Sequence, residues 1–199
     1  MKTSSPDPDP LQGLRTALAR QAPASAAMLA KALDVSIPTV HRLLANMPGD
    51  ELIVAGRARR TRYGLRRSLR GQLAQWPLYA VDEDGRAAQA GALSLVRPKG
   101  SWIAPQDAAW PVPEECRDGW WPGLPYLLYD MRPQGYMGRA FARLEHRSLG
   151  VSPDPREWGD DDILHVLLQR GWDASGNLIG GDEAYAQWQA WRRTLAPPL

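Results

Sequence analysis

The chain has 199 residues, of which 44% are hydrophobic and 23% are charged, proportions typical of a folded soluble protein. No apolar run reaches the roughly 20 residues needed to span a membrane, and the polar start lacks the apolar core of a secretory signal, so we expect no membrane partner and a cytoplasmic location. The single cysteine, Cys116, excludes an internal disulfide and a multi-cysteine zinc site.

The net charge of +2 conceals two halves of opposite sign. Residues 1–71 contain 12 Lys or Arg and 5 Asp or Glu, whereas residues 72–199 contain 12 and 17, and all nine Trp lie in the second part. Separate basic and acidic halves indicate separate roles, with the basic half facing a polyanion. These shifts predict a first domain at 11–70 and a second domain at 76–195. The first ten residues, rich in Pro and Asp, are predicted to be a disordered leader at 1–10.

Three short helices are predicted in the first domain. The spacing of leucines predicts a helix from Leu11 that ends by Ala22-Pro23. A second helix is expected over Ala26–Leu33 and a third from Ile37 to about Asn46, because a serine precedes each one as an N-cap. The side chains expected to face the core of the second and third helices are Met28, Leu29, Ala32, Leu33, Val40, Leu43 and Leu44.

The second and third helices form a helix-turn-helix pattern, because only a short turn separates them. In such a motif the exposed face of its latter helix, here the one from Ile37 to about Asn46, enters the major groove. Short polar or basic side chains on that face suit base edges and phosphates. The residues predicted to contact double-stranded DNA from this helix are Ser36, Thr39, His41 and Arg42. A homodimer is compatible with this motif, because its operators are usually two-fold sites.

A basic hairpin is predicted next, with strands near residues 51–55 and 61–65. Its tip is nearly all arginine, and the side chains predicted to meet DNA phosphates are Arg57, Arg59, Arg60 and Arg62. Residues 11–67 as a whole resemble the winged helix-turn-helix of bacterial regulators. That fold also serves as a protein-interaction module, which stays open as the alternative to DNA binding.

The second domain is predicted to be a small antiparallel sheet with helices, so the fold class is α+β. Strands are expected over Trp76–Val81, Ala87–Val96 and Trp102–Pro105, with a bulge or close approach at Gly91. Helices are expected over Gly138–Leu149, Asp160–Leu168 and Glu183–Leu195, the first with a shared face of Ala140, Phe141, Leu144 and Leu149.

Several sequence strings in this second domain are similar to the N-terminal lobe of HipA-family Ser/Thr kinase toxins. The most specific string is Asp130-Met131-Arg132-Pro133-Gln134-Gly135, and weaker ones are Tyr79–Arg86, Arg139–Arg143 and Ile163–Leu178. With a winged helix in front, residues 11–192 resemble the YjjJ-type branch of that family. The resemblance implies a HipA-like N-terminal lobe that contacts a kinase core.

The resemblance also implies that this chain is not itself an enzyme. In the family, the nucleotide-binding loop, the catalytic Asp and the magnesium ligands follow the segment represented here, so no catalytic residue is carried over and no cofactor or metal is predicted. The expected function is a DNA-binding regulatory module of a HipA-like toxin–antitoxin kinase system. The alternatives are the N-terminal part of an active kinase toxin and, more weakly, a ligand-sensing transcriptional regulator.

Four further features have a structural and a functional interpretation. Trp120 and Trp121 are predicted to contact a partner as an aromatic patch, although they could equally fill a small core. The acids at 160–162 favour a helix N-terminus over a cation site. The glycines of 177–182 indicate a tight turn, and His165 on an apolar helix indicates a core or interface residue.

Overall fold

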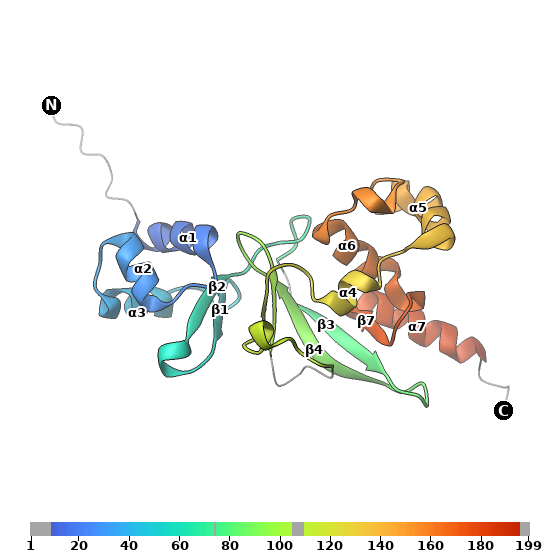
Figure 1. The fold of residues 1–199 in the computed structure, drawn as a ribbon, viewed down its shortest axis with the longest axis horizontal. Coiled ribbons are helices and arrows are strands. Elements are labelled where there is room, and N and C mark those ends of the chain that lie inside the picture. The colour runs from blue at the N-terminus through green and yellow to red at the C-terminus, as the bar shows by residue number, and fades with distance from the viewer. Residues whose placement is uncertain (1–8, 74, 105–109, 196–199) are drawn as a thin grey trace.

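The computed structural model describes residues 9–73, 75–104 and 110–195. Figure 1 shows an elongated chain with three helices and a two-stranded hairpin at one end. A five-stranded sheet follows, and four α-helices lie toward the other end. The prediction of a mixed α+β fold with a small antiparallel sheet is confirmed.

The three N-terminal helices are α1 (Pro10–Gln21), α2 (Ala26–Leu33) and α3 (Ile37–Ala45). Each begins with a side chain that accepts a backbone N–H left without a partner in the first turn. Asp9 accepts from Leu11, and the two predicted serine caps are confirmed, with Ser25 accepting from Met28 and Ser36 from Thr39.

A compact apolar cluster joins these helices. The fully buried side chains in it are Leu14, Leu18, Leu29 and Val40, with Leu43 and Leu44 nearly so. The predicted inward face of α2 is wrong in part, because Met28 is exposed and Ala32 lies in solvent, while Ala30 is buried instead. A helix of eight residues in which every residue but Lys31 is apolar carries too little periodicity to define its buried face.

The hairpin consists of β1 (Leu52–Ala55) and β2 (Arg62–Leu65), paired antiparallel with Leu52 opposite Leu65. A 3-10 turn at Ala58–Arg60 forms its tip. The segment between α1 and α2 joins it, since Ala24 and Tyr63 exchange backbone hydrogen bonds of 2.8 and 2.9 Å.

The main sheet has the strand order β6-β5-β4-β3-β7, and every neighbouring pair is antiparallel. The strands are β3 (Gln75–Val81), β4 (Ala87–Leu95), β5 (Ser101–Ile103), β6 (Trp120–Trp121) and β7 (Leu178–Gly180). The register shifts between Leu78 and Tyr79, opposite Gly91 and Gln89, so the predicted bulge beside Gly91 is confirmed.

Two edge strands differ from the prediction. A short extended piece ending at Ile179 and a tight turn of glycines were expected in this region, and the structure has β7 there, paired with β3. β6 was not predicted as a strand. Strands of two or three residues are too short for the alternation that identifies a strand in a sequence.

Four helices complete the C-terminal part: α4 (Tyr126–Asp130), α5 (Gly135–Leu149), α6 (Asp160–Arg170) and α7 (Gly181–Leu195). The core between them and the sheet includes Leu78, Leu93, Leu128, Ile163, Leu164 and Leu167, all at most 1% exposed. The predicted shared face of Ala140, Phe141, Leu144 and Leu149 on α5 is wrong for Leu144, because this side chain is 81% exposed whereas Leu149 is 6% exposed.

Candidate nucleic-acid interface and partner surface

The two faces of α3 differ in what they contact. Val40, Leu43 and Leu44 point into the core of the three-helix group. His41 and Arg42 are exposed on the opposite face. The core therefore does not use these two side chains, and they are available to a ligand.

The two hydroxyl residues predicted to contact DNA already have structural partners. The Ser36 Oγ accepts the backbone N–H of Thr39 at 3.3 Å and lies 2.9 Å from the Thr39 Oγ1. This pairing fixes the first turn of α3 and leaves its N-terminus at the surface, where backbone N–H groups favour anions. Ser36 is exposed and Thr39 half-buried. Because the Ser36 hydroxyl accepts the Thr39 N–H, Ser36 is the N-cap of α3.

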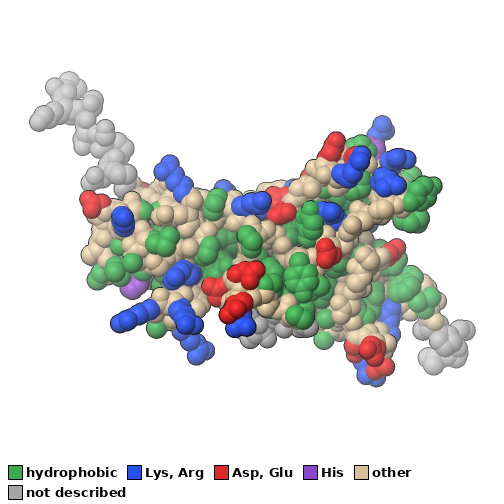
Figure 2. All heavy atoms as spheres, viewed as in Figure 1, with side chains coloured by type: hydrophobic (Ala, Val, Ile, Leu, Met, Phe, Trp, Pro, Cys, Tyr) green, Lys and Arg blue, Asp and Glu red, His purple; other side chains and the backbone are tan. Residues whose placement is uncertain are grey.

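The hairpin tip presents three exposed arginines, Arg57, Arg59 and Arg60. None of the three forms an ion pair with another of the described residues. The turn that carries them depends on Gly56, which has a φ of +85° and where a Cβ would lie 2.5 Å from the Arg60 carbonyl oxygen. Figure 2 shows basic side chains projecting from this region.

The fourth predicted phosphate contact, Arg62, has a different environment. Its Nη1 donates to the Thr61 carbonyl at 3.1 Å and to the Arg59 carbonyl at 3.5 Å, and the residue is half-buried. Arg62 therefore supports the shape of the tip that carries the other arginines.

The basic run of the sequence continues to Arg70, but its last members face the chain itself. Arg67 binds Asp161 with both Nη atoms, at 2.8 and 2.6 Å. Arg70 donates to Asp162 at 2.9 Å and to the carbonyls of Leu149 and Gly150 at 2.8 and 3.0 Å. The positive charge of Arg67 and Arg70, which the sequence pattern assigned to a polyanion, is therefore paired within the chain. No local signal in the sequence indicates this pairing.

These contacts attach the first part of the chain to the second. The backbone N–H of Arg67 donates to Leu95 at 2.9 Å, and that of Arg97 donates to Leu65 at 2.8 Å. Leu69, inside the predicted first domain, is 4% exposed in the core of the second part. Arg67, Leu69 and Arg70 therefore pack with the C-terminal part.

Trp120 and Trp121 do not form the exposed aromatic patch expected of a partner surface. They are 7% and 8% exposed. Trp120 packs with Ile53 of the hairpin, and a Cβ added to Gly64 would lie 2.7 Å from its ring. Both indoles thus have little surface left for a partner, and Trp120 fills the junction between the hairpin and the sheet.

The acids at the start of α6 accept hydrogen bonds from the backbone of the chain. The carboxylate of Asp160 accepts the Leu124 N–H at 3.3 Å, and Asp162 accepts the Gly159 N–H at 3.4 Å. No cluster of three potential metal ligands occurs among residues 9–73, 75–104 and 110–195.

Among the helices in those same ranges, none is long and apolar enough to cross a bilayer.

Burial shifts the pKa of His165 and that of Cys116. Burial lowers the pKa of His165 below its ordinary 6.5, and the neighbouring Arg70 cation lowers it further. Burial also raises the pKa of the Cys116 thiol, which disfavours a reactive thiolate. Both shifts agree with structural roles for these side chains.

Comparison with known proteins places this geometry in a family. Residues 72–189 match the family described as "YjjJ-like toxin, middle domain". The chain is similar to the curated protein "Toxin YjjJ" of Escherichia coli strain K12, with 34% identity over 184 residues. This alignment covers 92% of the chain but only 39% of the relative's length. No solved structure matches. Because the family match covers more than half of the chain, the chain belongs to the YjjJ-like toxin family.

Proposed function

We propose that this chain is the DNA-binding regulatory module of a HipA-like toxin–antitoxin kinase system. Residues 10–65 are a winged helix-turn-helix in this proposal, with α3 in the major groove and the hairpin tip as the wing. The C-terminal part holds a kinase core. The relation to a toxin supports the general class of function, and 61% of that relative's length lies outside the alignment.

One observation carries the DNA-binding half of the proposal. The hairpin tip carries three exposed arginines, and the exposed face of α3 carries His41 and Arg42. Figure 1 places α3 and the hairpin tip toward the same lower edge of the molecule. Arginines at the tip of a hairpin suit contacts with phosphates, while a helix face with polar and basic side chains suits contacts with base edges.

The experiment is DNA selection from a random library with the full chain, followed by titration of the selected duplex. His41→Ala together with Arg42→Ala should reduce the preference for the selected sequence over random DNA by at least tenfold, since a lost base contact costs about 1–3 kcal/mol. Arg193→Ala, near the end of α7, is the matched control and should leave the preference unchanged. Recovery of no enriched sequence would contradict the DNA-binding proposal and favour a protein-interaction module.

The kinase half of the proposal is tested separately, on the native protein captured from its host. An intact mass near 22.1 kDa together with a co-purifying kinase would support a separate regulatory subunit. A mass more than twice as large would support the alternative, in which the segment is the front of a kinase toxin. In this proposal the chain alone transfers no phosphate from ATP and magnesium, and robust transfer would overturn it.

A further inference from the structure

The outer face of α5 exposes an apolar stripe. Tyr136, Met137 and Leu144 are 78%, 76% and 81% exposed, the highest values among the large apolar side chains that the structure describes. They follow helical spacing together with Ala140, so all four lie on one side of the helix. The opposite side packs through Gly138, Ala142 and Leu149, so the exposed apolar side chains are not needed to hold α5 in place.

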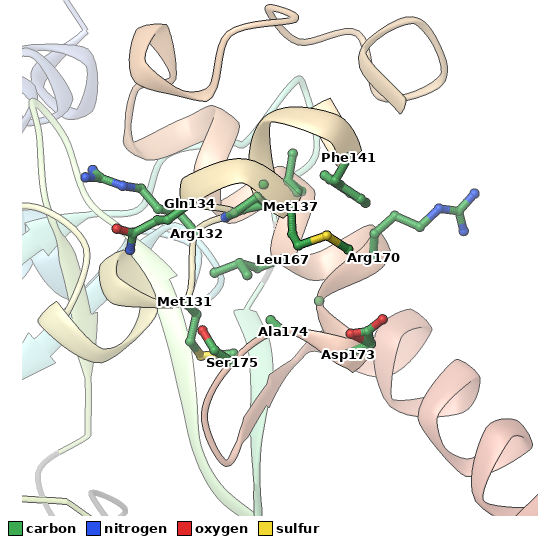
Figure 3. A pocket seen from close by; sticks show the side chains of 14 residues that line it. Met131, Arg132, Gln134, Met137, Phe141, Leu167, Arg170, Asp173, Ala174 and Ser175 are labelled. Carbon is green, nitrogen blue, oxygen red and sulfur yellow. The ribbon is translucent and has the colours of Figure 1, made fainter. Parts of the chain in front are cut away.

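An apolar groove of about 480 Å³ continues from this stripe. Its walls are α5, α6 and the turn that follows α6. In Figure 3, Met137 and Phe141 of α5 lie above Leu167, with Ala174 and Ser175 below. Met137 belongs to both the stripe and the groove, so the two form one continuous apolar surface.

A row of positive charge borders this surface. Arg139, Arg143 and Arg147 repeat every four residues along α5, and all three are exposed. No ion pair involves these three arginines within the part of the chain that the structure describes. At the groove itself, Arg132 and Arg170 extend in opposite directions in Figure 3, with Asp173 as the acid nearby.

We propose that the stripe and groove of α5 bind an amphipathic helix whose apolar face is bordered by Asp and Glu. An exposed apolar stripe beside a groove fits a helix that inserts side chains at helical spacing. The basic row selects acidic flanks by charge complementarity. A second copy of this chain is the poorer occupant, because apposing the same face would bring the three arginines against their own copies.

This inference rests on the proposed function, since it names the surface by which the C-terminal part holds the kinase core. It also moves the partner surface from Trp120 and Trp121, which are buried, to the exposed face of α5. The helix that binds there belongs to the kinase core in this proposal.

The test uses the full chain and two synthetic helical peptides with identical leucine faces. One peptide carries glutamates beside the leucines, and the other carries lysines at the same positions. The glutamate peptide should bind at least tenfold more tightly by calorimetry, and high salt should reduce the difference. Leu144→Glu should weaken its binding at least tenfold, while Val54→Glu, at an exposed apolar site on β1, should leave it unchanged.

A charge-reversed variant tests the selection by charge separately from the apolar contact. Arg143→Glu with Arg147→Glu should bind the lysine peptide in preference to the glutamate peptide. Thermal unfolding of each variant confirms that it folds, which the exposure of the substituted residues favours. Equal binding of both peptides, binding of neither, or binding that ignores Leu144→Glu would overturn the proposal.

Sedimentation of the wild-type chain separates this inference from a competing one. Dimerisation that Leu144→Glu abolishes would assign the stripe to a second copy and would also overturn the proposal. Because the probes are synthetic, none of these outcomes depends on a kinase. The co-purification experiment described above tests the kinase half of the proposed function separately.

Discussion

The guanidinium of Arg67 binds the carboxylate of Asp161 through two hydrogen bonds of 2.8 and 2.6 Å, although 94 positions separate the two residues. The first residue follows the hairpin and the second lies in the opening turn of α6. This pair, with Arg70 and Asp162 beside it, fixes the connection between the two parts of the chain. A module that carries a partner to DNA would need such a connection to be stiff.

We predict that Arg67→Ala lowers the free energy of unfolding by about 1–2 kcal/mol. The arginine side chain is 15% exposed and its partner 47%, so solvent screens part of the interaction and the expected loss lies toward the lower end for a charge-assisted bidentate pair. Urea unfolding measures it, and a double-mutant cycle with Asp161→Ala isolates the pair. The control is Arg86→Ala, because Arg86 and Asp84 are 78% and 71% exposed, and it should change stability by less than about 0.5 kcal/mol.

A second prediction concerns the contact of Gly64 with Trp120. A Cβ at Gly64 would lie 2.7 Å from the indole ring, so Gly64→Ala must displace a buried tryptophan. We expect a loss of about 1–3 kcal/mol, the usual range for overpacking. Thermal unfolding and Trp fluorescence report the change. Gly49→Ala is the matched control, since nothing lies within 4 Å of its added Cβ, and an equal effect of both variants would contradict the packing argument.

A third prediction is a steep salt dependence of DNA binding that the hairpin arginines produce. Each neutralised phosphate contributes about −0.9 to the slope of log K against log salt. Changing Arg57, Arg59 and Arg60 to Ala should therefore reduce the slope by about 2–3, whereas Arg62→Ala should change it less because its guanidinium binds carbonyls of its own hairpin. Fluorescence anisotropy over a salt series measures the slopes. An unchanged slope in the triple variant would contradict phosphate contacts at the tip.

A fourth prediction concerns pH. Because burial and Arg70 lower the pKa of His165 below 6.5, the unfolded chain takes up a proton more readily than the folded one. This histidine therefore lowers the free energy of unfolding as the pH falls through about 6.5. At higher pH its protonation does not contribute to that free energy. The nearby Asp162 carboxylate and the Leu149 backbone oppose the shift without reversing it.

Unfolding free energies at about pH 5.5 and about pH 8 test this sign. His165→Gln should reduce the loss of stability between the two pH values. His41→Gln, at an exposed site on α3, should leave that loss as it is in the wild type. A loss that His165→Gln does not alter would show that other groups cause the acid sensitivity.

Local sequence signals predicted much of the secondary structure. The serine caps Ser25 and Ser36 located α2 and α3, because capping depends on backbone groups within three residues. The bulge beside Gly91 was likewise predicted from one residue type. The exposed side chains proposed to contact DNA, His41 and Arg42, followed from the helical period of α3 and the burial of its leucines.

Only the tertiary structure decided what each charged or apolar surface faces. The arginines of 57–70 look alike in the sequence, yet those of the hairpin tip are exposed while Arg67 and Arg70 bind acids more than 90 positions away. The same reason decides two apolar side chains. Trp120, for which a partner patch and a small core were both open, is 7% exposed in the junction, and Leu144, expected to share a face with Leu149, is 81% exposed on α5. The sequence determined most of the helices and the longer strands, because those signals are local, but not the short strands β6 and β7. Burial and ion pairing were decided by long-range packing, which local periodicity does not encode.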